Sequence, residues 1–145
     1  MIHFCHLLTH NGGVGRTIQV DVVREALTRL GHATNHQLHQ EAVRSLPRLS
    51  IASVPRITAR LVDDGQARYA PSDGRTVVLD ANPDPHDHFR CTSCGGMFDI
   101  ALGPAVVDQI QTQLGRNIVR DGITVHGCCE VCAEASHPNN LRNDK

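Results

Sequence analysis

The sequence predicts an α+β protein in two parts, and three observations support this prediction. Apolar residues recur at three- and four-residue spacing through three successive segments of the first half. Two short extended runs follow, joined by a turn of sequence Pro-Ser-Asp-Gly-Arg. The second half carries two Cys-x-x-Cys pairs, separated by strand, helix and strand patterns. With 145 residues, the chain is long enough for two small domains.

The first half is expected to form three helices, and the first two have clear start and stop signals. The first helix begins at Thr17, and Gly31 ends it. The second begins at a capping box made by Thr34 and Gln37, and Pro47 is expected to end it.

The third helix begins at Ser50 or Ser53 and closes at Asp64. Extended runs over residues 67–70 and 76–80 then form a two-stranded ribbon. Three helices followed by such a ribbon are the plan of a winged helix-turn-helix. The residues of the third helix expected to face the core are Ile51, Val54, Ile57, Leu61 and Val62.

These elements predict a winged-helix domain over residues 1–80 and a Pro-containing hinge over residues 81–85. A second domain is expected over residues 86–132, followed by a flexible tail over residues 133–145. Within the second domain the patterns predict paired strands, a helix and a last strand, at residues 86–91, 97–100, 104–114 and 117–126.

Composition excludes several classes of protein. No apolar run approaches the roughly 20 residues of a membrane span, and the first residues lack the basic region of a signal peptide, so we expect a cytoplasmic protein. The formal net charge is -1, but residues 1–70 are net basic, which suits a polyanionic partner. Aromatic residues are only 3%, so a staple such as a metal ion is expected.

The two cysteine pairs are Cys91 with Cys94 and Cys129 with Cys132. In a reducing compartment, paired cysteines are more often metal ligands than disulfides. Each pair places two thiolates on one tight turn, and two such turns make a closed tetrahedral zinc site. Cys128 adjoins the second pair, so the sequence leaves open a shift of the ligand positions there by one residue, from Cys129 to Cys128.

Imidazoles and carboxylates form a second candidate site. His86 and His88 lie two apart on a predicted strand, so they share one face while Asp87 between them points away. Carboxylates before the hinge and on the returning strand are further candidates, as is a histidine ahead of the capping box. Such donors suit iron(II), manganese(II) or zinc. The full candidate set is His32, Asp80, His86, His88 and Asp99.

The third helix and the ribbon carry candidate DNA-binding residues. Arg56 and Arg60 are four apart and share one helix face near Ser53. A solvated basic face is the alternative, but three helices, a wing and positive charge together favour a reader of duplex DNA. The ribbon adds Arg68, Tyr69 and Arg75.

These motifs, in this order, resemble the ferric uptake regulator (Fur) family from about Arg16 to Cys132, over most of the chain. The resemblance rests on His-Ala-Thr at 32–34, Leu-Ser-Ile-Ala-Ser-Val at 49–54, Pro-His-Asp-His-Phe-Arg-Cys-Thr-Ser-Cys-Gly at 85–95 and Gly-Cys-Cys-Glu-Val-Cys at 127–132. The H-x-H-x-x-C-x-x-C-G run with a distal C-x-x-C is specific for this family.

The resemblance implies a homodimer that binds a double-stranded DNA operator through winged helices, with a C-terminal α/β dimerisation domain. It implies structural zinc on the four paired cysteines. It also implies regulatory iron(II) or manganese(II) on His32, Asp80, His86, His88 and Asp99, which would hold the winged helices at a spacing that suits DNA. Arg16 is what remains of the family's basic N-terminal motif, and it joins the DNA-binding candidates.

Two features favour the peroxide-sensing (PerR-like) members of the family. Position 99 is Asp, where iron-uptake members carry Glu. In PerR-like members, peroxide reacts with bound iron(II) and oxidises a ligating histidine, here His32 or His86, so that DNA is released. Three positions where iron-uptake members have ligands of a further site hold Pro85, Val106 and Asp121 instead.

Pro55 departs from the family pattern, because a Tyr usually precedes the recognition-helix Arg. Proline inside a helix costs about 3 kcal/mol but is tolerated in the first turn, which favours Ser53 as the cap. The leading hypothesis is a metal-dependent, PerR-like transcriptional repressor, not an enzyme. The alternative is a Fur-like protein that has lost sequence-specific DNA binding and buffers metal or pairs with a paralogue. A metallohydrolase is a third hypothesis, which no nucleophile or phosphate motif supports.

Overall fold

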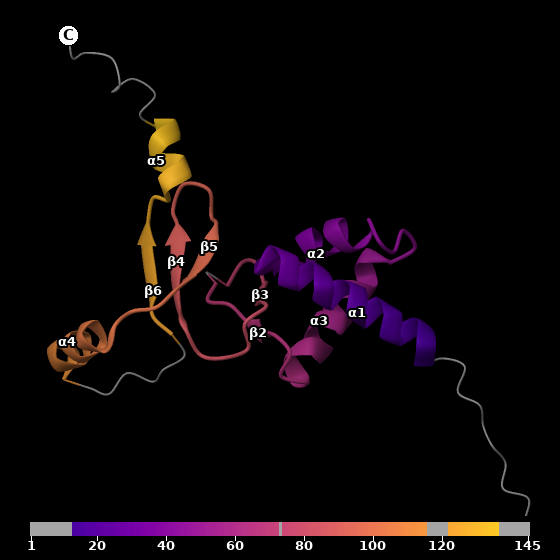
Figure 1. The fold of residues 1–145 in the computed structure, drawn as a ribbon, viewed down its shortest axis with the longest axis horizontal. Helices are drawn as coiled ribbons and strands as arrows, with labels where there is room; N and C mark the ends of the chain where they lie inside the picture. The colour runs from indigo at the N-terminus through magenta and orange to yellow at the C-terminus, as the bar shows by residue number, and fades with distance from the viewer. Residues whose placement is uncertain (1–12, 73, 116–121, 137–145) are drawn as a thin grey trace, which may run out of the picture. The chain divides into compact units, whose positions relative to one another are not determined.

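The computed structural model describes residues 13–72, 74–115 and 122–136, and the chain divides into two compact units between Pro83 and Asp84. The first unit holds α1 (Gly13–Leu30), β1 (His32–Thr34), α2 (Asn35–Ala42), the 3₁₀ helix η1 (Ile51–Ser53), α3 (Val54–Asp63), β2 (Arg68–Tyr69) and β3 (Val78–Asp80) (Figure 1). The second unit holds β4 (Asp87–Cys91), β5 (Met97–Ile100), α4 (Pro104–Leu114), β6 (Thr124–Gly127) and α5 (Glu130–Ser136).

The helices of the first unit pack around one apolar core. The prediction for α3 is confirmed at Val54, Ile57 and Leu61, and it is wrong at Ile51, which is 46% exposed because it lies in η1 ahead of α3. Val62 packs against the core while partly exposed. The buried core residues are Val23, Ala26, Leu27, Ala33, Leu38, Ala42, Leu49, Val54, Ile57, Leu61, Ala67 and Leu79.

The second helix begins as predicted but ends earlier. The Gln37 amide donates to Thr34 Oγ1 at 3.2 Å and the Thr34 amide donates to Gln37 Oε1 at 2.8 Å, so the capping box is formed. The helix ends at Ala42 rather than at Pro47, because the chain passes into tight turns such as the one closed by the Ser45 amide on the Ala42 carbonyl at 3.1 Å.

The predicted late start of the third helix is confirmed: Ser53 is its N-cap residue, although the Ser53 side chain makes no capping hydrogen bond. Ser50 Oγ accepts from the Ala52 amide at 3.3 Å and caps η1, whereas Ser53 is the N-cap residue of α3. Pro55 is therefore the second residue of α3, where an amide would have no partner within the helix, so proline is tolerated.

The first-unit sheet has one strand more than the predicted ribbon. Strands β2 and β3 form the expected pair, and β1 pairs antiparallel with β3 on its other side, giving the order β1-β3-β2. The added strand matters because its register sets His32 directly opposite Asp80.

In the second unit, β4 lies between antiparallel β5 and parallel β6. Helix α4 occupies the predicted residues, and β6 covers only the end of the predicted last strand; residues 116–121 lie outside the described ranges. Helix α5 continues to Ser136, so residues 133–136 of the expected tail are helical, and residues 137–145 lie outside the described ranges. Across the described ranges, no helix combines the length and the apolar character needed to cross a membrane.

Candidate metal centres and nucleic-acid interface

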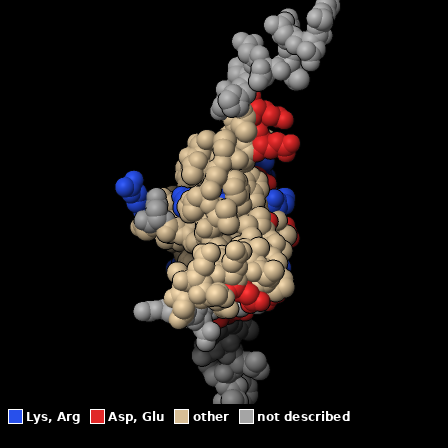
Figure 2. Space-filling model, turned by 90° about the vertical axis from the view of Figure 1, so that its left-hand side faces the viewer, with Lys and Arg blue, Asp and Glu red and all other residues tan. Residues whose placement is uncertain are grey.

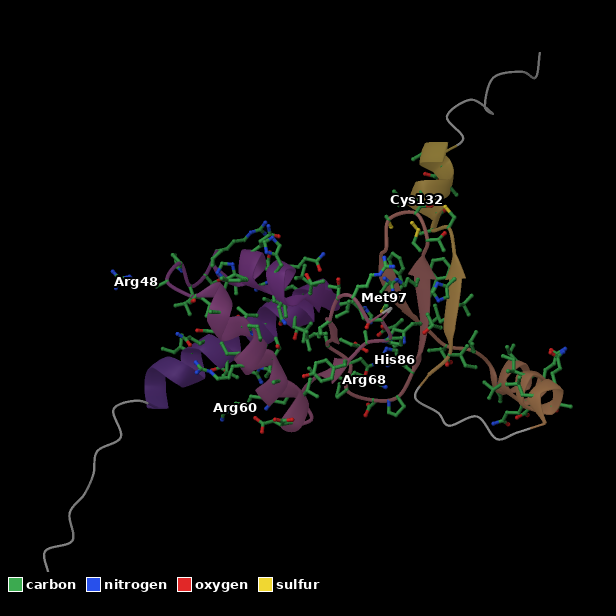
Figure 3. The ribbon with its side chains drawn as sticks, turned by 180° about the vertical axis from the view of Figure 1, so that it is seen from behind. Arg48, Arg60, Arg68, His86, Met97 and Cys132 are labelled. Carbon is green, nitrogen blue, oxygen red and sulfur yellow. The ribbon has the colours of Figure 1, made fainter. Side chains whose placement is uncertain are left out.

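The four paired cysteines come together at one end of the second-unit sheet. Cys91 ends β4, Cys94 lies in the turn to β5, Cys129 precedes α5 and Cys132 lies in its first turn. Their sulfur atoms all lie within 4.8 Å of one another, and those of Cys94 and Cys129 are 3.9 Å apart. Figure 3 shows these yellow sulfur atoms beside Cys132, where α5 meets the strands. Four sulfurs at about 2.3 Å from a zinc ion would lie about 3.8 Å apart, so the cluster fits a closed tetrahedral site.

Hydrogen bonds fold the first cysteine loop and join it to the second. Gly95, with φ of 72°, brings its amide back to the Cys91 carbonyl at 2.9 Å. The amide and hydroxyl of Thr92 donate to the Gly127 carbonyl at 2.7 and 3.1 Å. The first loop is thereby held against the end of β6, which leads directly into the second loop.

The thiols of the cluster differ in acidity. The Cys129 amide donates to Cys91 Sγ at 3.3 Å and, with the Cys94 amide, lowers the pKa of the Cys91 thiol from 9.0 to about 5. Hydrogen bonds with the Cys129 and Cys94 sulfurs raise the pKa of Cys132 from 9.0 to about 12. One thiolate is thus stable by itself, whereas four adjacent thiolates need a cation that displaces the remaining protons.

Cys128 lies outside the sulfur cluster. Its Sγ is exposed to solvent and lies 3.6 Å from Ser93 Oγ. The second pair that clusters is therefore Cys129 with Cys132. Cys5 falls outside the described residues.

His86, His88 and Asp99 form a three-donor group in the second unit. Strand pairing sets His88 opposite Asp99, His86 Nε2 lies 3.1 Å from Asp99 Oδ1, and the two imidazole centroids are 4.3 Å apart. His86 Nδ1 lies 2.7 Å from the Asp84 carbonyl oxygen. Because a carbonyl only accepts, Nδ1 is the donor in this contact, and Nε2 is the ring nitrogen that faces Asp99.

His32 and Asp80 form a two-donor group in the first unit. His32 Nε2 lies 3.6 Å from Asp80 Oδ1, and the Asp80 carboxylate is buried. The Asn82 amide donates to Asp80 Oδ1 at 2.8 Å, and the Ala81 amide donates to the Gly31 carbonyl at 2.8 Å. These bonds fix the chain on both sides of the pair. The five predicted ligands thus fall into two groups, one in each unit.

Arg56 and Arg60 lie on the exposed side of α3, and Figure 3 labels Arg60 on this helix. Arg60 Nε lies 3.4 Å from Asp64 Oδ2, but both side chains are exposed, and such surface pairs contribute at most about 1 kcal/mol, so Arg60 remains able to bind a phosphate. A groove between α1 and α3 is lined by Gln19, Val20, Arg56, Ile57 and Arg60.

The other DNA-binding candidates lie on different elements of the first unit. Arg68 and Tyr69 form β2, and the Tyr69 ring is 51% exposed. Arg75 is exposed in the connection from β2 to β3. Ser53 stands at the start of α3, and Arg16 lies in α1 with its side chain outside what the structure describes.

Sequence reasoning missed the backbone groups that hydrogen-bond to these candidate ligands. They are the Asp84 carbonyl, the Asn82 amide and the Cys129 amide, all of them backbone groups. Backbone groups are present in every residue, so no residue-type signal in the sequence could have revealed them. Gln19, which lines the groove with both arginines, is not among the candidate residues that the sequence singled out.

No sequence-family model matches the chain, and no curated protein matches it by sequence. Solved structures do match. The Campylobacter jejuni peroxide stress regulator is 22% identical, with a TM-score of 0.64 over 87% of this chain and 99% of that one. The Francisella tularensis ferric uptake regulator with iron is 16% identical, with a TM-score of 0.63 over 92% and 99%. A zinc uptake regulator complexed with zinc and DNA is 18% identical, with a TM-score of 0.54 over 82% and 83%. These proteins are regulators rather than enzymes, and the chain has the fold of the ferric uptake regulator family.

Proposed function

We propose that the chain is a metal-dependent, DNA-binding transcriptional repressor of the Fur family, acting in the cytoplasm and responding to iron(II) or manganese(II) and to peroxide. One observation carries this proposal. Imidazole and carboxylate donors stand in two groups, His32 with Asp80 and His86 with His88 and Asp99, one group in each unit of a fold shared with known regulators.

The four clustered cysteines are proposed to hold structural zinc. Four sulfur donors complete a tetrahedral shell and leave no open position for a substrate or a water molecule. The cluster joins the end of β4 to the start of α5, so its ion would stabilise the second unit rather than react.

The regulatory ion is proposed to bind both donor groups at once. Each group alone offers two or three ligands, whereas together they offer five, in the imidazole and carboxylate chemistry that suits iron(II) and manganese(II). Such an ion binds the joined arrangement of the units more tightly than the separated one, so it shifts their population. A full shift, from about 1% to about 99% joined, requires roughly a 10⁴-fold difference in affinity.

A homodimer is proposed because the second-unit sheet exposes an apolar row. Strand register aligns Phe98, Phe89 and Val125 across β5, β4 and β6, and the side chains of Phe98 and Val125 are 49% and 39% exposed. Figure 2, which looks onto the second unit from the side of α4 and β6, shows few charged atoms there. Two copies joined in this way would present two α3 helices to successive half-sites of a DNA duplex.

The peroxide part of the proposal rests on Asp99, the residue type that the peroxide-sensing members carry at this position. Bound iron(II) supplies the reactivity towards peroxide. His32 and His86 are the ligands proposed to be oxidised, and either oxidation removes an imidazole donor. The joined arrangement of the units, and with it DNA binding, would then be lost.

A second candidate function is metal buffering without sequence-specific DNA binding, and Pro55 favours it. Pro55 lies exposed in the first turn of α3, next to Arg56, and it offers neither an amide nor a polar side chain to a base edge. In this case the metal sites would be kept while the DNA-reading surface is altered.

Fluorescence anisotropy separates the two functions. Zinc-loaded protein is titrated onto tiled fragments of its own upstream DNA, with and without manganese(II). The repressor proposal expects selective binding that requires manganese(II) and that His86→Ala abolishes, while Asp108→Asn, an exposed change on α4, leaves binding intact. Peroxide treatment after iron loading is expected to release the DNA and to add the mass of one oxygen to His32 or His86.

No selective binding by a folded, zinc-containing dimer would overturn the repressor proposal and favour metal buffering. Selective binding that survives His86→Ala would instead show that DNA binding does not depend on the regulatory ligands.

A further inference from the structure

Asp87 stands between two proposed ligands, yet its carboxylate binds the backbone of two other segments. Asp87 Oδ2 accepts from the Leu102 amide at 3.1 Å, and Oδ1 accepts from the Ile123 amide at 2.8 Å. Leu102 follows β5, and Ile123 directly precedes β6. One side chain at the start of β4 therefore joins it to the ends of both neighbouring strands.

The chain around Gly122 completes this junction. Gly122 has φ of 101°, and a Cβ atom there would overlap the His86 carbonyl oxygen. The next residue accepts a hydrogen bond as well, because the His88 amide donates to the Ile123 carbonyl at 2.8 Å. Residues 122–123 thus lie directly along the backbone that carries both histidines.

These bonds give Asp87 a role different from that of its neighbours. On β4 the side chains of Asp87 and His88 point to opposite faces of the sheet. Each carboxylate oxygen of Asp87 is already engaged by a backbone amide, and bonds to an ionised acceptor are the stronger kind. The Asp87 carboxylate therefore binds two backbone amides rather than belonging to the donor group of the proposed ion.

We propose that Asp87 is the positioning residue of the His86–His88–Asp99 donor group. Its carboxylate fixes the backbone at residues 86–88 so that both imidazoles stay beside Asp99, ready to receive an ion. The role rests on the proposed metal-binding function, because it concerns the ligands of that ion. Its structural part, the clamp on Leu102 and Ile123, exists without the ion.

Manganese(II) titration of the zinc-loaded chain tests the proposal, with electron paramagnetic resonance reporting free manganese. Outer partners of metal ligands typically change metal affinity by about 10- to 100-fold. Asp87→Ala is expected to weaken manganese(II) binding in that range without loss of zinc. Asp87→Asn keeps one acceptor oxygen, so it should fall between wild type and Asp87→Ala. Gly122→Ala should also weaken binding, because it displaces the His86 carbonyl.

Asp108→Asn is the matched control, because it removes the same charge from an exposed position on α4, and it should bind manganese(II) like wild type. Amide hydrogen exchange in the manganese-free, zinc-loaded chain adds a second readout. The Leu102 and Ile123 amides should be protected in wild type and exchange quickly in Asp87→Ala. If Asp87→Ala loses its zinc, the manganese(II) titration and the hydrogen-exchange measurement are made on Asp87→Asn instead.

The outcomes separate this inference from the proposed function. Should wild type fail to bind manganese(II) or iron(II), the proposed function fails, and the exchange of the two amides still decides whether Asp87 clamps them. Wild-type affinity in both Asp87 variants would overturn the inference. So would equal exchange of the two amides in wild type and variants.

Discussion

The two units differ in what stabilises them. In the first unit, apolar side chains from three helices, from β1 and β3 and from the connections form one buried core, which runs from Val23 to Leu79 in the sequence. In the described part of the second unit, the buried residues are Cys91, His88 and Val107, and two of these are proposed metal ligands. The large apolar residues Phe98 and Val125 remain exposed there. Packing therefore stabilises the first unit, whereas the second would depend on the proposed zinc ion and the proposed partner surface.

Removal of zinc is expected to have the largest effect on stability. We expect this effect in the second unit alone. Structural zinc contributes on the order of 10–16 kcal/mol in zinc-finger peptides, and the few buried residues described here cannot replace it. Chelation, or Cys94→Ser, should abolish hydrogen-exchange protection over residues 87–115 and 122–132 while residues 18–72 stay protected. Exchange measured by mass spectrometry checks this.

Cys128→Ser is the control for the zinc experiment, because its sulfur lies outside the cluster. This variant should keep both its zinc and its protection pattern. Equal loss of protection in the two units after chelation would contradict the contrast between them.

A core substitution in the first unit should produce the opposite pattern. Leu61 is fully buried in α3, so Leu61→Ala should lower the free energy of unfolding of the first unit by about 2–5 kcal/mol. Urea unfolding measures that loss, and a zinc assay should show unchanged metal content. Ile51→Ala, at an exposed position, should change the unfolding free energy by less than about 0.5 kcal/mol. Zinc loss in Leu61→Ala would show that the units do not fold independently.

A charge on the exposed apolar row tests whether a partner surface completes the second unit. Phe98→Glu should raise the dimer dissociation constant by about 10- to 100-fold, or about 1.4–2.7 kcal/mol, because the carboxylate would be buried unpaired. Analytical ultracentrifugation measures this constant. Ile18→Glu replaces a comparably exposed residue of α1 and should leave the dimer intact. An unchanged constant in Phe98→Glu would place the interface elsewhere.

The smallest expected effect is the loss of the α2 cap. Thr34→Ala removes the oxygen that accepts from the Gln37 amide, which should cost the first unit about 1 kcal/mol. Thermal unfolding, monitored by circular dichroism, measures this loss of stability. Thr28→Ala, in the middle of α1, removes a hydroxyl that bonds only its own helix and serves as the comparison. A loss of zinc on Thr34→Ala would be unexpected.

Elements whose causes are local could be predicted from the sequence. The capping box, the stop at Gly31 and the bounds of α4 each depend on residues a few positions apart. Strand β1 was missed because it has three residues and exists only through its pairing with β3, far along the chain. Helix α5 was missed because a seven-residue helix at the edge of a polar tail has no apolar period to reveal it.

The candidate site likewise has a part that could be predicted from the sequence and a part that could not. The cysteine pairs and the two histidines could be predicted, because ligand chemistry restricts both residue type and spacing. The contacts of Asp87 could not, because alternation along a strand gives only the direction in which its carboxylate points. Its partners, Leu102 and Ile123, reach it through the fold alone.

Strand β4 links the two proposed centres of the second unit. His88 and Cys91 stand on the same short strand, three residues or roughly 10 Å apart. The proposed zinc ion would order the Cys91 end of β4, and with it the strand that carries His88. If both proposals hold, a newly made chain would bind its ions in a fixed order, with zinc first and the regulatory ion second. On the proposed function, a zinc-starved cell would then hold a chain that does not respond to iron(II) or manganese(II), whatever their concentration.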